Sequence, residues 1–109
     1  MLSAAKHLSF ERIARRDEVL RILAAHRGDF EQFGVRSIAI FGSVARDEAG
    51  PESDVDVLVE FERSPSFDQY MRLKLYLEDL LGTSVDLASL KTLKPRVRPR
   101  IESEAIRVA

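Results

Sequence analysis

The stretch Ser37–Phe61, SIAIFGSVARDEAGPESDVDVLVEF, decides the fold. It holds two short runs of apolar residues with the composition of β-strands, Ile38–Phe41 and Val55–Phe61. The polar segment between them contains Gly50 and Pro51, which predict a loop that turns the chain back. The two runs are therefore predicted to be strands of one sheet.

Two carboxylates stand at the start of the second run. Asp54 and Asp56 are two positions apart, so on a strand they share a face and lie roughly 7 Å from each other. Two like charges on one face repel each other unless a cation neutralises them. Mg²⁺ takes oxygen ligands, and it commonly uses one or two protein carboxylates together with water and substrate phosphates. The pair therefore predicts a metal site for a phosphate-bearing substrate.

Gly42 and Ser43 follow the first run and complement the carboxylates. Because glycine has no Cβ, it allows a phosphate to approach the backbone closely. Ser43 can open a short helix through Val44, Ala45 and Arg46, whose free N–H groups favour an anion. The sequence thus predicts that a phosphate-binding turn faces the metal-binding carboxylates.

This arrangement resembles a known superfamily. A Gly-Ser pair, ten residues and then Asp-x-Asp match the signature of the DNA polymerase β-like nucleotidyltransferases. The compact form GSVAR…SDVDVLVEF resembles the minimal nucleotidyltransferase (MNT) antitoxins of two-gene HEPN/MNT toxin–antitoxin pairs. The resemblance implies an α/β (α+β) fold, with a small mixed sheet of three to four strands, helices packed on one face, and a single domain over residues 1–109. The chain departs from the pattern at Val44 and Asp47, where many relatives have a basic residue and a glycine.

A third carboxylate joins the candidate site through this resemblance. Thr83–Ala88, TSVDLA, predicts a third strand with Asp86 on the face opposite its apolar residues. In the family a third acidic residue on a neighbouring strand completes the metal site, so the resemblance assigns that role to Asp86. The alternative is an edge-strand aspartate that keeps the protein soluble.

The resemblance also implies the chemistry of these residues. Two Mg²⁺ ions would be held by Asp54 with Asp56 and by Asp56 with Asp86, and ATP would be the substrate. Asp86 could accept the proton of the attacking hydroxyl. Ser43 and its preceding glycine would bind the phosphates. Arg46 would either join them or form a salt bridge with a nearby acid.

The implied function is that of an antitoxin that transfers AMP from ATP to a tyrosine hydroxyl of a HEPN-family ribonuclease toxin. Because no additional domain that would hold an acceptor is recognisable, the acceptor is expected on another chain. Two alternatives stay open. One is a non-catalytic antitoxin that binds and occludes its toxin. The other is a nucleotidyltransferase that acts on a small molecule of the aminoglycoside type.

The amino-acid composition limits the cellular compartment and the classes of partner that we expect for this protein. The absence of cysteine excludes disulfides, thiolate zinc sites and a cysteine nucleophile. With no apolar run of membrane-spanning length and no signal-peptide core, we expect a cytoplasmic protein without a membrane partner. Asp47–Glu62 contains seven acids and no base, while Lys91–Ala109 contains six bases and two acids. Together with a net charge of −1, this balance argues against direct nucleic-acid binding.

One helix is predicted before the first two strands in the sequence, and another after them. Ser9–Arg27 has apolar residues at helical spacing, and Gly28 is expected to end it. Ser66 and Gln69 form a capping box for a second helix that runs to Leu81.

A last helix is predicted in the C-terminal segment. It should begin near Pro95 or Pro99, because proline is tolerated in the first helical turn. Its apolar stripe would consist of Val97, Ile101, Ala105 and Val108. The basic residues Arg96, Arg98 and Arg100 could bind a phosphate, meet an acidic partner or face solvent, and the sequence leaves these alternatives open.

Overall fold

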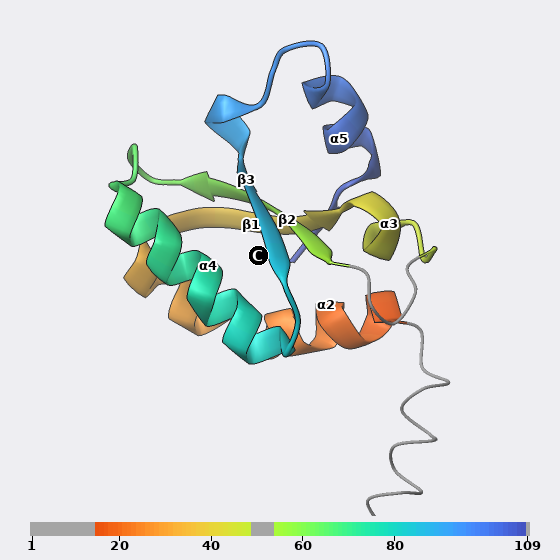
Figure 1. Cartoon of the computed structure of the whole chain (residues 1–109), viewed down its shortest axis with the longest axis horizontal. Coiled ribbons are helices and arrows are strands. Elements are labelled where there is room, and N and C mark those ends of the chain that lie inside the picture. The colour runs from red at the N-terminus through yellow and green to blue at the C-terminus, as the bar shows by residue number, and fades with distance from the viewer. Residues whose placement is uncertain (1–14, 49–53, 109) are drawn as a thin grey trace, which may run out of the picture.

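The computed structural model describes residues 15–48 and 54–108. Its centre is a four-stranded sheet in the order β3-β2-β1-β4 (Figure 1). The strands are β1 (Val35–Phe41), β2 (Val55–Phe61), β3 (Val85–Ser89) and β4 (Ile106–Arg107). β1 is antiparallel to both β2 and β4, whereas β2 is parallel to β3. The predicted mixed α+β architecture is confirmed.

Four helices and two 3₁₀ segments surround the sheet in the described part of the chain. They are α2 (Arg15–Ala25), η1 (Arg27–Phe33), α3 (Gly42–Ala45), α4 (Phe67–Leu81), η2 (Leu90–Thr92) and α5 (Arg98–Glu104). The two long helices, α2 and α4, lie on one side of the sheet, and α5 lies on the other side near α3 (Figure 1). Within the described ranges, none of the helices has the length and apolar character needed to cross a membrane.

The core lies between the sheet and the two long helices. Val55, Val57 and Val59 of β2 have no exposed surface, and they share one cluster with Leu23 of α2 and Leu73 of α4. Burying a side chain of this size contributes about 1.5–3 kcal/mol relative to leaving it exposed. The predicted valine face is therefore confirmed as the face that the long helices cover.

The ends of α4 follow the local sequence signals. The Ser66 hydroxyl accepts a hydrogen bond from the Gln69 N–H at 3.0 Å, and Gly82 ends the helix in the left-handed conformation with φ 68°. The Gln69 side chain does not reach back to Ser66, as a full capping box requires. It donates instead to the Phe33 carbonyl at 2.6 Å, which ties α4 to η1.

The first predicted helix ends two residues earlier than expected. Residues 9–14 lie outside the described residues, and α2 ends at Ala25. Gly28 does not end it, because this glycine lies inside η1, and Gly34 is the residue with a positive φ of 72°. The physical reason is Phe30, which is only 2% exposed and draws the segment after α2 into the core.

The C-terminal segment is only partly helical. α5 begins at Arg98 with a proline in its first turn, as predicted, but it ends at Glu104. Ala105 and Val108 were expected to continue its apolar stripe, and this expectation is wrong. The chain there forms β4, in which Ile106 pairs with Ile40, and the Val108 N–H donates to the Ile38 carbonyl at 2.8 Å. Pairing with the open edge of β1 satisfies backbone groups that a longer helix would have left unpaired.

Candidate active site

The three predicted carboxylates lie at the same end of the sheet. Asp56 and Asp86 are direct register partners on the parallel strands β2 and β3, and Asp54 stands one residue before β2. Burial raises the pKa of Asp56, and the negative charges of Asp86 and Asp54 raise it further, as does a side-chain hydrogen bond with Asp86. The predicted placement of Asp86 on the face opposite its apolar neighbours is confirmed, since Val85 and Leu87 are buried and Asp86 is exposed.

Gly42 makes room for one of these carboxylates. It follows β1, whose last residue pairs with Asp56, and it has a φ of 73°. A Cβ at this position would lie 2.9 Å from Cγ of Asp56 and still closer to its Oδ2. Only glycine therefore fits here, on grounds of both backbone conformation and space. The sequence alone pointed to the approach of a phosphate as the reason for this glycine and gave no sign of the contact with Asp56.

Ser43 lies in α3, which confirms the predicted short helix after the first strand. The helix is anchored by Val44 and Ala45, which are 0% and 6% exposed. Ser43 itself is half-buried, and its hydroxyl has no hydrogen-bond partner in residues 15–48 and 54–108. The hydroxyl is therefore free to bind a ligand at the turn that follows β1.

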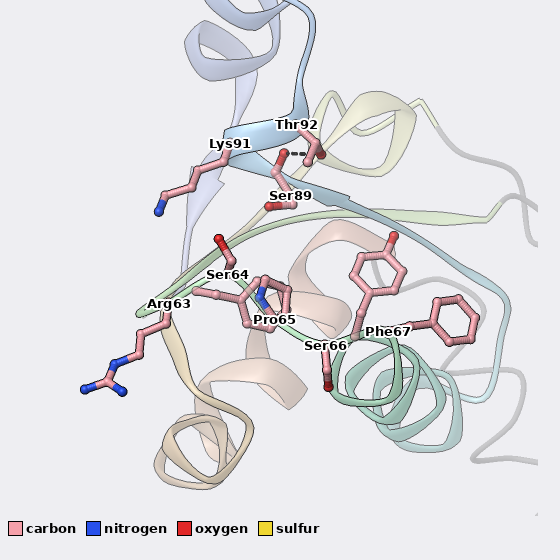
Figure 2. Close-up of a pocket in the computed structure, with 10 residues that line it drawn as sticks. Arg63, Ser64, Pro65, Ser66, Phe67, Ser89, Lys91 and Thr92 are labelled. Atoms are coloured by element: carbon pink, nitrogen blue, oxygen red, sulfur yellow. Dashed lines mark hydrogen bonds between the residues drawn. The ribbon is translucent and has the colours of Figure 1, made fainter.

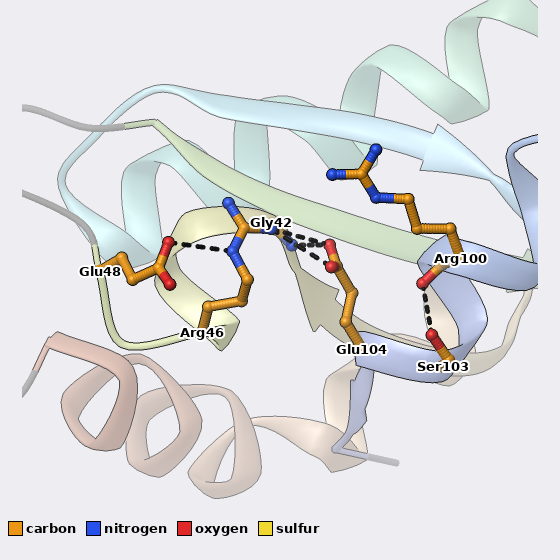
Figure 3. A network of polar contacts seen from close by, with 6 residues as sticks. All are labelled: Gly42, Arg46, Glu48, Arg100, Ser103 and Glu104. Atoms are coloured by element: carbon orange, nitrogen blue, oxygen red, sulfur yellow. Dashed lines mark hydrogen bonds and ion pairs between the residues drawn. The ribbon is translucent and has the colours of Figure 1, made fainter.

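Arg46 lies between two acidic side chains (Figure 3). Its Nε donates to Oε1 of Glu48 at 3.1 Å, and its Nη1 donates to both carboxylate oxygens of Glu104 at 3.1 and 3.2 Å. The hydrogen bond with Glu48 is the largest cause of a raised pKa for Arg46. Of the two roles that the sequence left open for this arginine, the structure contains the salt bridge.

Glu104 is the residue of this site that sequence reasoning missed. Besides binding Arg46, its Oε1 accepts a hydrogen bond from the Gly42 N–H at 3.0 Å. Glu104 stands at the end of α5, 62 positions after Gly42 in the sequence. No local pattern signals such a contact, because it depends on β4 returning the chain to the edge of β1.

The carboxylates of Asp56 and Asp86 fit a magnesium ion. In the part of the chain that the structure describes, no three Asp, Glu or His side chains gather closely enough to enclose a metal by themselves. Mg²⁺ does not need such an enclosure, since it takes one or two protein carboxylates and completes its shell with water and phosphate oxygens. Burial first, and then the negative charges of Asp86 and Asp54, raise the pKa of Asp56, and a divalent cation would offset that repulsion.

A pocket of about 440 Å³ lies at the opposite end of β2 and β3 (Figure 2). It is formed where β2 leads into α4 and β3 leads into η2, and its lining includes Phe61, Phe67 and Tyr70. Arg63 and Lys91 extend outward from its rim (Figure 2). None of the six residues predicted for the site lines this pocket. The candidate active site is the open end of the sheet that carries the carboxylates.

Comparisons with known proteins agree with this geometry. Residues 21–108 match the nucleotidyltransferase domain family. The protein adenylyltransferase MntA of Thermococcus cleftensis is 44% identical over 93 residues, which cover 84% of this chain and 94% of that protein. A solved structure described as a minimal nucleotidyltransferase is 43% identical, with a TM-score of 0.65, over 85% of this chain and 88% of that one.

A more distant solved structure shares the fold. It is the complex of a tri-AMPylated HEPN toxin with its MNT antitoxin from Shewanella oneidensis. The matching chain is 15% identical, with a TM-score of 0.57, over 87% of this chain and 69% of that one. The family match and the two close relatives decide the assignment. This chain belongs to the nucleotidyltransferase domain family and has the polymerase β-like fold of the minimal nucleotidyltransferases.

Proposed function

We propose that this protein is an adenylyltransferase antitoxin that transfers AMP from ATP to a tyrosine hydroxyl of a HEPN-family toxin. The observation that carries the proposal is the Asp56–Asp86 pair on adjacent strands, with Gly42 packed against Asp56. The similarity to a protein adenylyltransferase supports the transferred group. The shared fold with the MNT antitoxin of an AMPylated HEPN toxin supports the class of partner.

Each residue of the site receives a role. Asp54, Asp56 and Asp86 would hold Mg²⁺, and Gly42 with Ser43 would bind the phosphates of ATP. Bound magnesium supplies positive charge that stabilises both the attacking and the leaving oxygen of an in-line displacement. The Ser43 hydroxyl would donate to a phosphate oxygen.

The reaction is a substitution at the α-phosphorus of ATP. The tyrosine oxygen forms a bond to this phosphorus, the bond to the bridging oxygen breaks, and pyrophosphate leaves. Asp86 would accept the hydroxyl proton, because it is exposed and stands beside Asp56. Arg46 would contact a phosphate through Nη2, since Glu48 and Glu104 bind its Nε and Nη1.

The acceptor can be mapped directly. The protein is incubated with Mg²⁺, ATP labelled at the α-phosphate and the HEPN protein encoded by the neighbouring gene, and the digested partner is sequenced by mass spectrometry. We expect AMP on a tyrosine, and no label when that tyrosine is replaced by phenylalanine or when magnesium is chelated. A tight complex without label would contradict transfer and would leave occlusion as the way in which the toxin is neutralised.

A further inference from the structure

Glu104 is held at a fixed point of the fold between α5 and β4. The N–H of the next residue, Ala105, donates to the Ile101 carbonyl at 3.0 Å and closes the helix. One position further, Ile106 pairs with Ile40 near the end of β1. The side chain of Glu104 is only 20% exposed. Its carboxylate is therefore brought to the Gly-Ser turn by backbone hydrogen bonds on both sides.

The carboxylate binds both ends of α3 (Figure 3). Gly42 is the first residue of this helix and donates its N–H at 3.0 Å, and Arg46 is the residue that caps its C-terminus and donates Nη1 at 3.1 Å. A helix of four residues has too few internal hydrogen bonds to hold itself. Hydrogen bonds that involve charged groups are roughly twice as strong as neutral ones. Glu104 thus fixes the short helix that carries Ser43.

Gly42 also contacts the side of the site that carries the carboxylates. Gly42 is held by Glu104, while the space where its Cβ would lie is filled by the Asp56 carboxylate. Any movement of Gly42 therefore changes the placement of Ser43 relative to Asp56. Glu104 therefore helps to fix how far the phosphate-binding turn lies from the carboxylates.

The charge of Glu104 has the opposite effect on an incoming nucleotide. It adds a second carboxylate beside Arg46, which already pairs with Glu48. By Coulomb's law such a charge repels the ATP phosphates. If Glu104 organises the turn, removing its charge should weaken nucleotide binding. If Glu104 mainly repels the phosphates, removing its charge should strengthen nucleotide binding.

We propose that Glu104 is a positioning residue for the nucleotide, holding Gly42 and Arg46 so that Ser43 stands ready beside Asp56 before ATP binds. This inference rests on the proposed function, because it takes the Gly-Ser turn as the phosphate-binding element. Glu104 need not touch ATP.

The test compares Glu104→Gln with Glu102→Gln. Both substitutions remove one negative charge from α5, but Glu102 pairs with Arg98 on the exposed surface and makes no hydrogen bond or ion pair with α3 in the described part of the chain. Binding of magnesium and a non-hydrolysable ATP analogue is measured by calorimetry at a temperature where every variant is folded. We expect the Kd to rise about fivefold in E104Q and to stay unchanged in E102Q. Glu104→Asp, which keeps the charge but is shorter, should lie between them.

A second readout does not need the nucleotide. Amide hydrogen exchange at Gly42 should be faster in E104Q, while exchange in α4 stays the same. Tighter analogue binding in E104Q would overturn the proposal, because the carboxylate would then be a competitor of the phosphates. An equal Kd in E104Q and the unchanged chain would also overturn it and leave the proposed function intact. No binding to the unchanged chain would contradict the nucleotide site itself and both proposals with it.

Discussion

The two faces of β2 have different functions. On one face Val55, Val57 and Val59 are fully buried, and they join the sheet to the long helices. On the other face, burial and then the like charges of Asp86 and Asp54 raise the pKa of Asp56, which means that its ionised form is disfavoured in the folded protein. One face therefore stabilises the fold, and the other gives up stability for the proposed cation site. Alternation along a single seven-residue strand keeps the two apart.

The largest expected effect is on the carboxylate face. In Asp56→Asn we expect the rate of AMP transfer to fall by at least roughly 100-fold, because even outer partners of metal ligands cost about 10–100-fold when removed. The thermal midpoint should rise or stay equal, because the substitution removes a partly buried charge that Asp86 and Asp54 also repel. Pyrophosphate release and calorimetry measure the two quantities. A variant that is both inactive and clearly less stable would contradict the proposed division between the faces.

The valine face should respond in the opposite way. In Val57→Ala we expect the free energy of unfolding to fall by about 2 kcal/mol, since two buried methyl groups are lost and a cavity remains. The transfer rate per folded molecule should change less than twofold. Urea unfolding gives the stability, and the rate is measured well below the unfolding transition. A large loss of rate with unchanged stability would place Val57 in the active site and would contradict the proposed division between the two faces.

Gly42 packs against the carboxylate face, and the cost of replacing it has two separable parts, one from its backbone conformation and one from the contact with Asp56. Gly42→Ala should lower the free energy of unfolding by more than the roughly 1–2 kcal/mol that a positive φ costs a non-glycine residue, because the new Cβ also meets Asp56. Gly82→Ala is the matched control, since Gly82 has a similar φ of 68° but open space around its Cβ position. Urea unfolding of both variants measures the difference. Equal destabilisation by both would mean that the Asp56 carboxylate moves away without cost.

The smallest effect concerns a tyrosine behind the valine face. Burial and a hydrogen bond to Asp29 raise the pKa of Tyr76 to about 12. Because the folded state favours the neutral phenol, its contribution to stability should be complete below pH 10 and should disappear as the pH rises toward about 12. Absorbance at alkaline pH follows the phenol directly. Tyr76→Phe, which keeps the ring contact with Phe33, should lack this transition.

Local signals predicted the parts of the fold that depend on neighbours in sequence. Ser66 and Gly82 bound α4 as expected, because capping needs only the residues within one turn. The alternation around Asp56 and Asp86 gave their shared face correctly. What the sequence did not reveal were β4 and the contacts of Glu104, since these arise only when the C-terminal segment meets the edge of β1.

The most direct test of the account is the intact mass of the HEPN partner after incubation with ATP, Mg²⁺ and this protein. We expect the partner to gain whole AMP units, and we expect the gain to disappear when both Asp54 and Asp56 are replaced by asparagine, although the complex still forms. A gain of the same size with the double variant would contradict the assignment of catalysis to the carboxylate face. An unchanged mass with the wild-type chain would contradict transfer to this partner altogether.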